Sequence, residues 1–138
     1  MNSEAKQFSP LEAGTDLGEL VLTVSPAANE RYWRAAGVDH PLLRAGALYP
    51  PIAANLTVLL FGGACADPVI QTRQVLRCHR LAQAGTELVT TGHVTAKYVK
   101  RQRHYVDVEA TVMTAADDAP LWTSTVSFTP AADVGLTS

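Results

Sequence analysis

The second half of the chain alternates between apolar and polar positions. Four stretches carry this period of two and are rich in β-branched residues: 68–81, 86–99, 103–115 and 121–130. The breaks between them are short, so neighbouring stretches can pair directly as antiparallel strands. A similar stretch, LGELVLTVS, occupies 17–25. The pattern therefore predicts about five antiparallel strands.

Two segments between the first and second of these strands have helical features. In SPAANERYWRAAG, Ser25 suits an N-cap, Pro26 the first helical residue and Gly37 a C-terminal stop. The segment PPIAANLTVLLFGG, 50–63, begins with prolines, is apolar almost all the way round and ends in paired glycines. Such a helix should be buried. Because the strand at 103–115 is apolar on one face, we expect this helix to cover the sheet there.

Length and composition narrow the class of protein. The 138 residues suit one domain, predicted over 17–130, between a flexible N-terminus at 1–16 and a flexible tail at 131–138. A net charge of −2 gives no electrostatic reason to expect nucleic acid or a membrane surface as a partner. No segment resembles a signal peptide or a membrane span. Cys65 and Cys78 lack metal-site spacing and disulfide density, which indicates reduced thiols in a cytoplasmic protein.

Charged residues cluster in two neighbouring parts of the predicted sheet. The basic run KYVKRQRH, 97–104, predicts a solvated hairpin tip rather than a polyanion site. Asp107 and Glu109 share a strand face and are interpreted as structural carboxylates that face cross-strand Lys97 or Arg101. The sequence shows no cluster of ligands with metal spacing, so neither a metal nor a cofactor is expected.

A sheet wrapped round one buried helix is the hot-dog architecture, an α+β fold. The run VLRCHRLAQAGTELVTTGHVTAKYVKRQRHYVDVEATV resembles the MaoC-like dehydratase and hydratase family, with Gly85, the KRQR hairpin and the YVDVEA strand as its firmest anchors. The resemblance covers roughly residues 17–129. It implies an acyl thioester of coenzyme A or acyl carrier protein as substrate, and reversible addition of water across a 2-enoyl double bond as the reaction.

Active members of that family carry an Asp and a His in the loop before the central helix, in a stretch that reads approximately GD.NP.H. Aligned on its glycine and proline, the segment AAGVDHPLL places Val38 at the Asp position and Leu43 at the His position. If the register slips so that Asp39 takes the acid position, Arg44 falls at the His position and stays protonated. Neither register restores the catalytic pair.

Three hypotheses remain open for this loop. In the first, Asp39 and His40 form a rearranged acid and base, with Tyr49 or Asn55 as a supporting donor, in a self-sufficient hydratase or dehydratase. In the second, which we favour, the chain is the substrate-binding subunit of a dehydratase pair. The segment GALYPPIAANLTVLLFGG followed by VIQTRQVLRCHRLAQAG resembles the non-catalytic subunit of (3R)-hydroxyacyl carrier protein dehydratases. In the third, the chain is a hot-dog thioesterase, although the helix at 50–63 contains no acid.

The resemblance also places a substrate site at the start of the central helix. Pro50 and Pro51 have no N–H, so a thioester oxygen would be held by the amides of Ile52 and Ala53. The predicted substrate-binding residues are these two together with Tyr49 and Asn55. A long unpaired edge strand further predicts a homodimer, or a heterodimer with a second hot-dog subunit.

Overall fold

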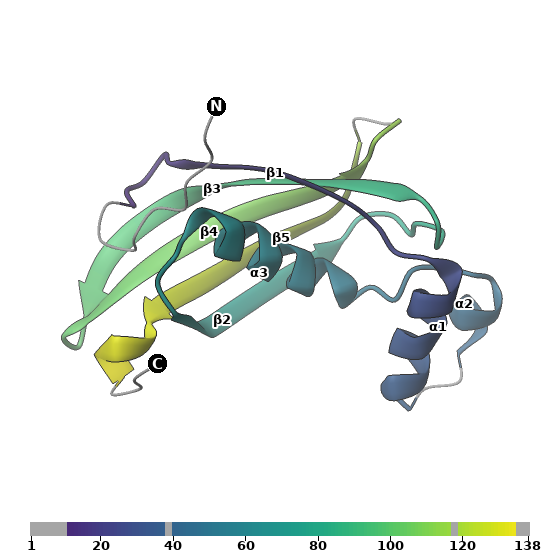
Figure 1. The fold of residues 1–138 in the computed structure, drawn as a ribbon, viewed down its shortest axis with the longest axis horizontal. Helices are drawn as coiled ribbons and strands as arrows, with labels where there is room; N and C mark the ends of the chain where they lie inside the picture. Colours follow the sequence, from purple (N-terminus) through teal and green to yellow (C-terminus); the bar gives the residue numbers. More distant parts are fainter. Residues whose placement is uncertain (1–10, 38–39, 117–118, 135–138) are drawn as a thin grey trace.

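The computed structural model describes residues 11–37, 40–116 and 119–134. Within them, five strands form one antiparallel sheet in the order β1-β3-β4-β5-β2 (Figure 1). The five predicted strands are confirmed, and β1 and β2 form the two edges of the sheet. The strands are β1 (Asp16–Thr23), β2 (Val69–Cys78), β3 (Glu87–Lys100), β4 (Arg103–Thr114) and β5 (Pro120–Pro130).

The three α-helices of the described residues lie between β1 and β2 in the sequence. α1 spans Pro26–Ala35, and it begins as predicted, because the Ser25 hydroxyl accepts a hydrogen bond from the Ala28 amide (3.1 Å). A four-residue helix, α2 (Pro41–Arg44), was not predicted. α3 (Ile52–Ala64) lies along the inner face of the sheet, and a short 3₁₀ helix, η1 (Ala131–Val134), follows β5 (Figure 1).

The core lies between α3 and the sheet, as the alternation in β4 predicts. Phe61 of α3 stacks on Phe128 of β5, with ring centroids 4.1 Å apart. The hydroxyls of Thr57 and Ser124 share a buried hydrogen bond of 2.5 Å between the same two elements. The inner face of β4 is buried beneath the helix through Val106, Val108, Ala110 and Val112.

Two features of α3 differ from the prediction. The helix continues through Gly62 and Gly63 to Ala64. The extended residue Cys65 follows and donates its N–H to the Phe61 carbonyl (2.8 Å). Paired glycines alone do not stop a helix unless one of them adopts the left-handed conformation of a C-cap, and neither does so here. The helix is also buried on one side only, since its outward face is exposed in the isolated chain.

Parts of both ends of the chain pack against the domain in the residues that the structure describes. Leu11 is fully buried in the core, although the segment 11–16 was predicted to be flexible. At the other end, Asp133 of η1 accepts hydrogen bonds from the His104 backbone N–H (2.7 Å) and Nδ1 (3.0 Å). The remaining residues of both predicted ends lie outside the described part.

A buried amide from α1 fixes the segment that leads into α3. Asn29 donates from Nδ2 to the Ala47 carbonyl (2.9 Å), and its Oδ1 accepts from the Tyr49 backbone N–H (2.8 Å). On the other side, the Leu48 N–H donates to the Ala82 carbonyl (2.7 Å). The chain is thus held from two directions just before α3 begins, which sets the position of the helix start.

Gly92 in β3 allows α3 to approach the sheet closely. A Cβ at this position would lie 2.8 Å from the Glu109 carbonyl oxygen and 3.0 Å from Leu60 Cδ2. We expect Gly92→Ala to lower the free energy of unfolding by about 1–3 kcal/mol through overpacking, as measured by urea denaturation. The exposed neighbour His93→Ala should stay within about 0.5 kcal/mol of the parent. Parental stability in Gly92→Ala would contradict this close packing.

The Asn29 amide should contribute measurably to stability. Asn29→Ala leaves the Tyr49 N–H without its partner in a partly buried position, which costs about 1–3 kcal/mol in the free energy of unfolding. The control is Glu30→Ala, which removes only an exposed ion pair with Arg34 and should cost less than about 1 kcal/mol. If the two variants unfold at the same urea concentration, Asn29 does not fix the segment.

Candidate functional site

His40 packs beside α1, and one of its ring nitrogens is already hydrogen-bonded. Its ring is exposed and stacks on Trp33, with ring centroids 5.9 Å apart and planes 14° from parallel. Its Nδ1 accepts a hydrogen bond from the Leu42 backbone N–H (3.1 Å). In a neutral imidazole, this bond assigns the proton to Nε2 and occupies the one nitrogen lone pair that could take another proton. The other predicted catalytic residue, Asp39, lies outside the described residues, as does Val38.

Aromatic rings connect α1 to the start of α3. Trp33 is buried and donates its indole N–H to the Ala47 carbonyl (3.0 Å), so it anchors α1 to this segment. Tyr49 is half-buried and packs edge-on against Trp33, with centroids 5.0 Å apart. Tyr32 also stacks on Tyr49, with ring centroids 6.4 Å apart. Tyr49 thus lies at the predicted site, as part of an aromatic cluster.

The first turn of α3 leaves its amides without a side-chain cap. Pro51 is the N-cap residue and contributes no capping hydrogen bond. The Ile52 side chain is buried in the core, and its amide donates to the Tyr49 carbonyl (3.0 Å). Ala53 follows in the same turn, where backbone N–H groups have no partner within the helix. An oxyanion could therefore be bound here by the Ala53 amide, with less contribution from Ile52.

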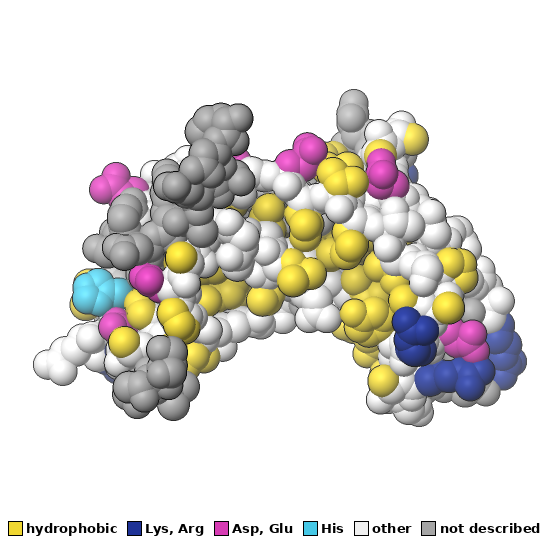
Figure 2. Space-filling model, viewed as in Figure 1, with side chains coloured by type: hydrophobic (Ala, Val, Ile, Leu, Met, Phe, Trp, Pro, Cys, Tyr) yellow, Lys and Arg dark blue, Asp and Glu magenta, His cyan; other side chains and the backbone are white. Residues whose placement is uncertain are grey.

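The outward face of α3 forms an apolar stripe. Its members are spaced as one face of a helix and are all exposed, whereas the residues between them face the sheet. Leu59 is 56% exposed and Val58 38% exposed, and Leu22 on the neighbouring strand β1 extends this surface at 37%. Figure 2 shows apolar side chains gathered along the centre of this face of the molecule. The α3 stripe consists of the apolar Val58 and Leu59, the glycines Gly62 and Gly63, and one polar residue, Asn55.

A cavity of about 450 Å³ lies against α1. It opens between α1, α2 and the segment before α3, and two arginines, Arg34 and Arg44, contribute to its wall together with Glu30. Glu30 and Arg34 form an ion pair along α1. Among the described residues, Tyr49, Ile52 and Asn55 do not line this cavity, so it is distinct from the predicted substrate site.

Other chemistries find little support among the described residues. Within that part of the chain, no three His, Cys, Asp or Glu side chains are grouped so that they could hold a metal ion. Cys65 is buried, and burial raises the pKa of its thiol, so it is a poor nucleophile at neutral pH. None of the described helices is both long enough and apolar enough to cross a lipid bilayer.

Asn29 fixes the backbone at the candidate site, and sequence reasoning missed this role. In the sequence it is one polar residue of an ordinary surface helix, and its backbone partners lie eighteen and twenty residues further along the chain. Asparagine prefers caps and turns to helix interiors, so its place in the middle of a helix was the available signal.

Comparison with known proteins identifies the fold. No family model matches the chain, and no curated protein sequence matches it. Among solved structures, the chain is similar to the R-hydratase PhaJ1 from Pseudomonas aeruginosa, with 16% identity and a TM-score of 0.76 over 91% of this chain and 86% of that one. An (R)-hydratase from A. caviae involved in PHA biosynthesis gives 18% identity and a TM-score of 0.72 over 86% and 96%.

A two-subunit enzyme is also among the similar structures. The HadBC (3R-hydroxyacyl-ACP dehydratase) complex from Mycobacterium tuberculosis matches with 13% identity and a TM-score of 0.67, over 83% of this chain and 98% of that one. The order of the strands and the position of α3 on the inner face indicate the same fold as these structural similarities. The chain has the hot-dog fold of the MaoC-like hydratases and dehydratases.

Proposed function

We propose that this chain binds acyl thioesters of the (R)-specific 2-enoyl hydratase and 3-hydroxyacyl dehydratase type, as the substrate-binding subunit of a dehydratase pair. The observation that carries the proposal is the loss of the catalytic pair within a hydratase-like fold. In the register anchored on Gly37 and Pro41, Val38 and Leu43 fall at the positions of the Asp and His, and an aliphatic side chain can neither activate water nor carry a proton.

The environment of His40 supports a role other than catalysis. A general base must present a free lone pair to water, whereas Nδ1 of His40 accepts from the Leu42 N–H. Its ring is stacked against Trp33, which is itself fixed to the Ala47 carbonyl. His40 thus helps to shape the loop, and recruiting it as a base would require the ring to leave this position.

The start of α3 is the proposed site for the thioester carbonyl. The positive end of the helix dipole and the uncapped amides of the first turn favour an oxygen with partial negative charge. Tyr49 flanks this point, and Asn55 lies one turn further along, on the exposed stripe. The acyl chain would then follow the apolar stripe of α3, between this subunit and its partner.

A second hot-dog subunit is the natural cover for that stripe. Burying a side chain such as Leu59 contributes about 1.5–3 kcal/mol, and Val58 beside it adds to this. The edge strand β2 also offers unpaired backbone groups to a neighbouring sheet. Both features are consistent with the heteromeric organisation of the HadBC complex, and the partner would supply the missing acid and base.

Activity should therefore require a partner. We expect the purified chain to show no hydration of a 2-enoyl thioester above background, and to gain activity when a hot-dog subunit with an intact Asp and His pair is added. Asp39→Asn and His40→Gln should bind the acyl thioester like the parent, since neither residue is assigned to the chemistry. Spectrophotometric loss of the enoyl thioester measures turnover, and calorimetry measures binding.

Two results would favour the other hypotheses. Turnover by the purified chain that falls about a hundredfold or more in His40→Gln would make the loop a rewired active site with Asp39 and His40 as acid and base. Release of free thiol from a saturated acyl thioester would instead indicate a thioesterase. Either result would contradict the role of a substrate-binding subunit.

The apolar stripe gives a separate test of assembly. We expect the parent chain to sediment as a dimer or larger, alone or with its dyad-bearing partner, and Leu59→Glu to shift it to monomer because a carboxylate would be buried at the contact. Val99→Glu is the matched control, since Val99 is 63% exposed but lies near the β3–β4 hairpin. Unchanged assembly in Leu59→Glu would show that the stripe is not the interface.

A further inference from the structure

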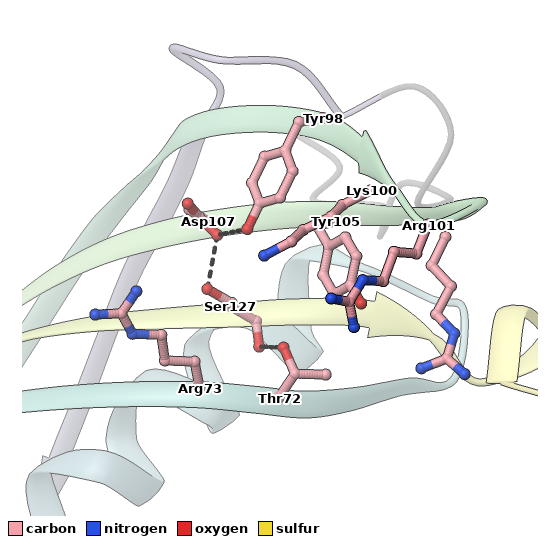
Figure 3. Close-up of a pocket in the computed structure, with 9 residues that line it drawn as sticks. Thr72, Arg73, Tyr98, Lys100, Arg101, Tyr105, Asp107 and Ser127 are labelled. Atoms are coloured by element: carbon pink, nitrogen blue, oxygen red, sulfur yellow. Dashed lines mark hydrogen bonds between the residues drawn. The ribbon is translucent and has the colours of Figure 1, made fainter.

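An open pocket of about 410 Å³ lies on the outer face of the sheet, near the β3–β4 hairpin (Figure 3). Its residues alternate with Val106 and Val108, which are buried beneath α3, so the pocket and the helix are on opposite faces. Cross-strand pairing builds it in rows. Asp107 pairs with Ser127, and Ser127 with Arg73, while the hairpin row pairs Lys100 with Arg103.

Positive charge dominates this pocket, although the chain as a whole carries a net charge of −2. Four cations, Arg73, Lys100, Arg101 and Arg103, line it together with a single carboxylate, Asp107. Arg103 is close enough to Asp133 for its positive charge to help lower the pKa of that carboxyl group. The other three form no ion pair with any residue that the structure describes. Clustered and unneutralised cations of this kind attract an anionic ligand.

Asp107 is held in the middle of the pocket by hydrogen bonds rather than by a cation. The Tyr98 hydroxyl donates to its Oδ1 (2.9 Å), and the Ser127 hydroxyl donates to the same oxygen (2.7 Å). The prediction that Asp107 pairs with Lys97 or Arg101 is therefore wrong, because its hydrogen-bond partners are Tyr98 and Ser127. Lys97 pairs with Val106 and lies on the inner face of the sheet. The second carboxylate oxygen remains available to accept from a ligand hydroxyl.

The floor of the pocket includes a pair of aromatic rings. Tyr98 stacks on Tyr105 across the strands, with centroids 5.3 Å apart and planes 14° from parallel. Burial raises the pKa of the Tyr98 phenol, and its hydrogen bond to Asp107 raises it further, so the phenol remains a donor. One ring of the pair is 37% exposed, which leaves an aromatic surface beside the cations.

The hairpin turn holds an arginine where glycine is usual. Arg101 and Gln102 have φ angles of 51° and 66°, in the left-handed region that two-residue hairpins require and that glycine or asparagine normally fills. Such conformations are concentrated at functional sites. In Figure 3, Lys100 reaches back from this turn over the sheet toward Asp107 and Ser127.

We propose that this pocket binds a nucleoside diphosphate. Lys100, Arg101 and Arg73 contact the phosphates, the base packs against the tyrosine pair, and Asp107 accepts a hydrogen bond from the sugar. Figure 1 places the hairpin at the opposite end of the sheet from α1 and α2, so this site is separate from the start of α3 and does not depend on the proposed thioester binding. A partner that pairs with the β2 edge through backbone groups would leave this face open.

The test is titration calorimetry of the purified chain with ADP, pyrophosphate and adenosine. ADP should bind at least tenfold more tightly than either fragment, because each fragment lacks one half of the contacts. Raising the salt from about 50 mM to about 200 mM should weaken ADP binding, as expected for exposed charges. Pyrophosphate that binds as tightly as ADP would overturn the nucleotide assignment, and absence of ADP binding would overturn the site.

Matched variants locate the binding. Lys100→Gln should weaken ADP binding about tenfold through loss of a charge-assisted contact, and Tyr98→Leu should weaken ADP but not pyrophosphate. Lys97→Gln removes the same charge from the same strand on the opposite face, and it should leave ADP affinity unchanged. Circular dichroism checks that each variant is folded. Equal losses in Lys97→Gln and Lys100→Gln would show a general charge effect and contradict the proposal.

Discussion

The packing of α3 on the inner face of the sheet is the contact on which the rest of the molecule depends. One helix must cover a curved sheet, so its inward face carries large apolar residues such as Phe61, and the sheet provides room for it at Gly92. A helix in that position has a second face that the sheet cannot reach. The same constraint that builds the core therefore leaves Val58 and Leu59 exposed in the isolated chain, and it accounts for an apolar surface that is suited to a second subunit.

The loop before α3 owes its shape to buried polar contacts rather than to apolar packing. Asn29 uses both atoms of its amide on the backbone of Ala47 and Tyr49, and Trp33 adds a third bond to the same segment. The same segment includes His40, whose Nδ1 accepts a hydrogen bond from the Leu42 N–H. Together these contacts fix the backbone that leads into α3.

Local patterns predicted the elements of the fold, because local physics determines them. Alternation gave the strands, and Ser25 followed by proline gave the start of α1. Features that depend on distant contacts were not predictable. Asn29 bonds to residues far along the chain, and Leu11 is buried in a core formed mostly by distant residues. The hydrogen bonds of Asp107 follow from the β3–β4 and β4–β5 registers. At the candidate site, the sequence indicated which residues lie before α3, but the hydrogen bond that His40 accepts from the Leu42 N–H could not be predicted from it.

The register of β3 and β4 also explains why one strand pair can serve two surfaces. Alternation sends Val106 and Val108 toward α3, and it sends Tyr105 and Asp107 to the outer face. The bulge between Val94 and Ala96 shifts this alternation in β3, and it brings Tyr98 opposite Tyr105 on the outer side. Without the bulge, every residue of β3 after Val94 would point to the opposite face. Lys97 would then lie on the outer face and Tyr98 on the core side. The basic pocket therefore depends on the bulge in β3. Its charged residues and α3 lie on opposite faces of the sheet.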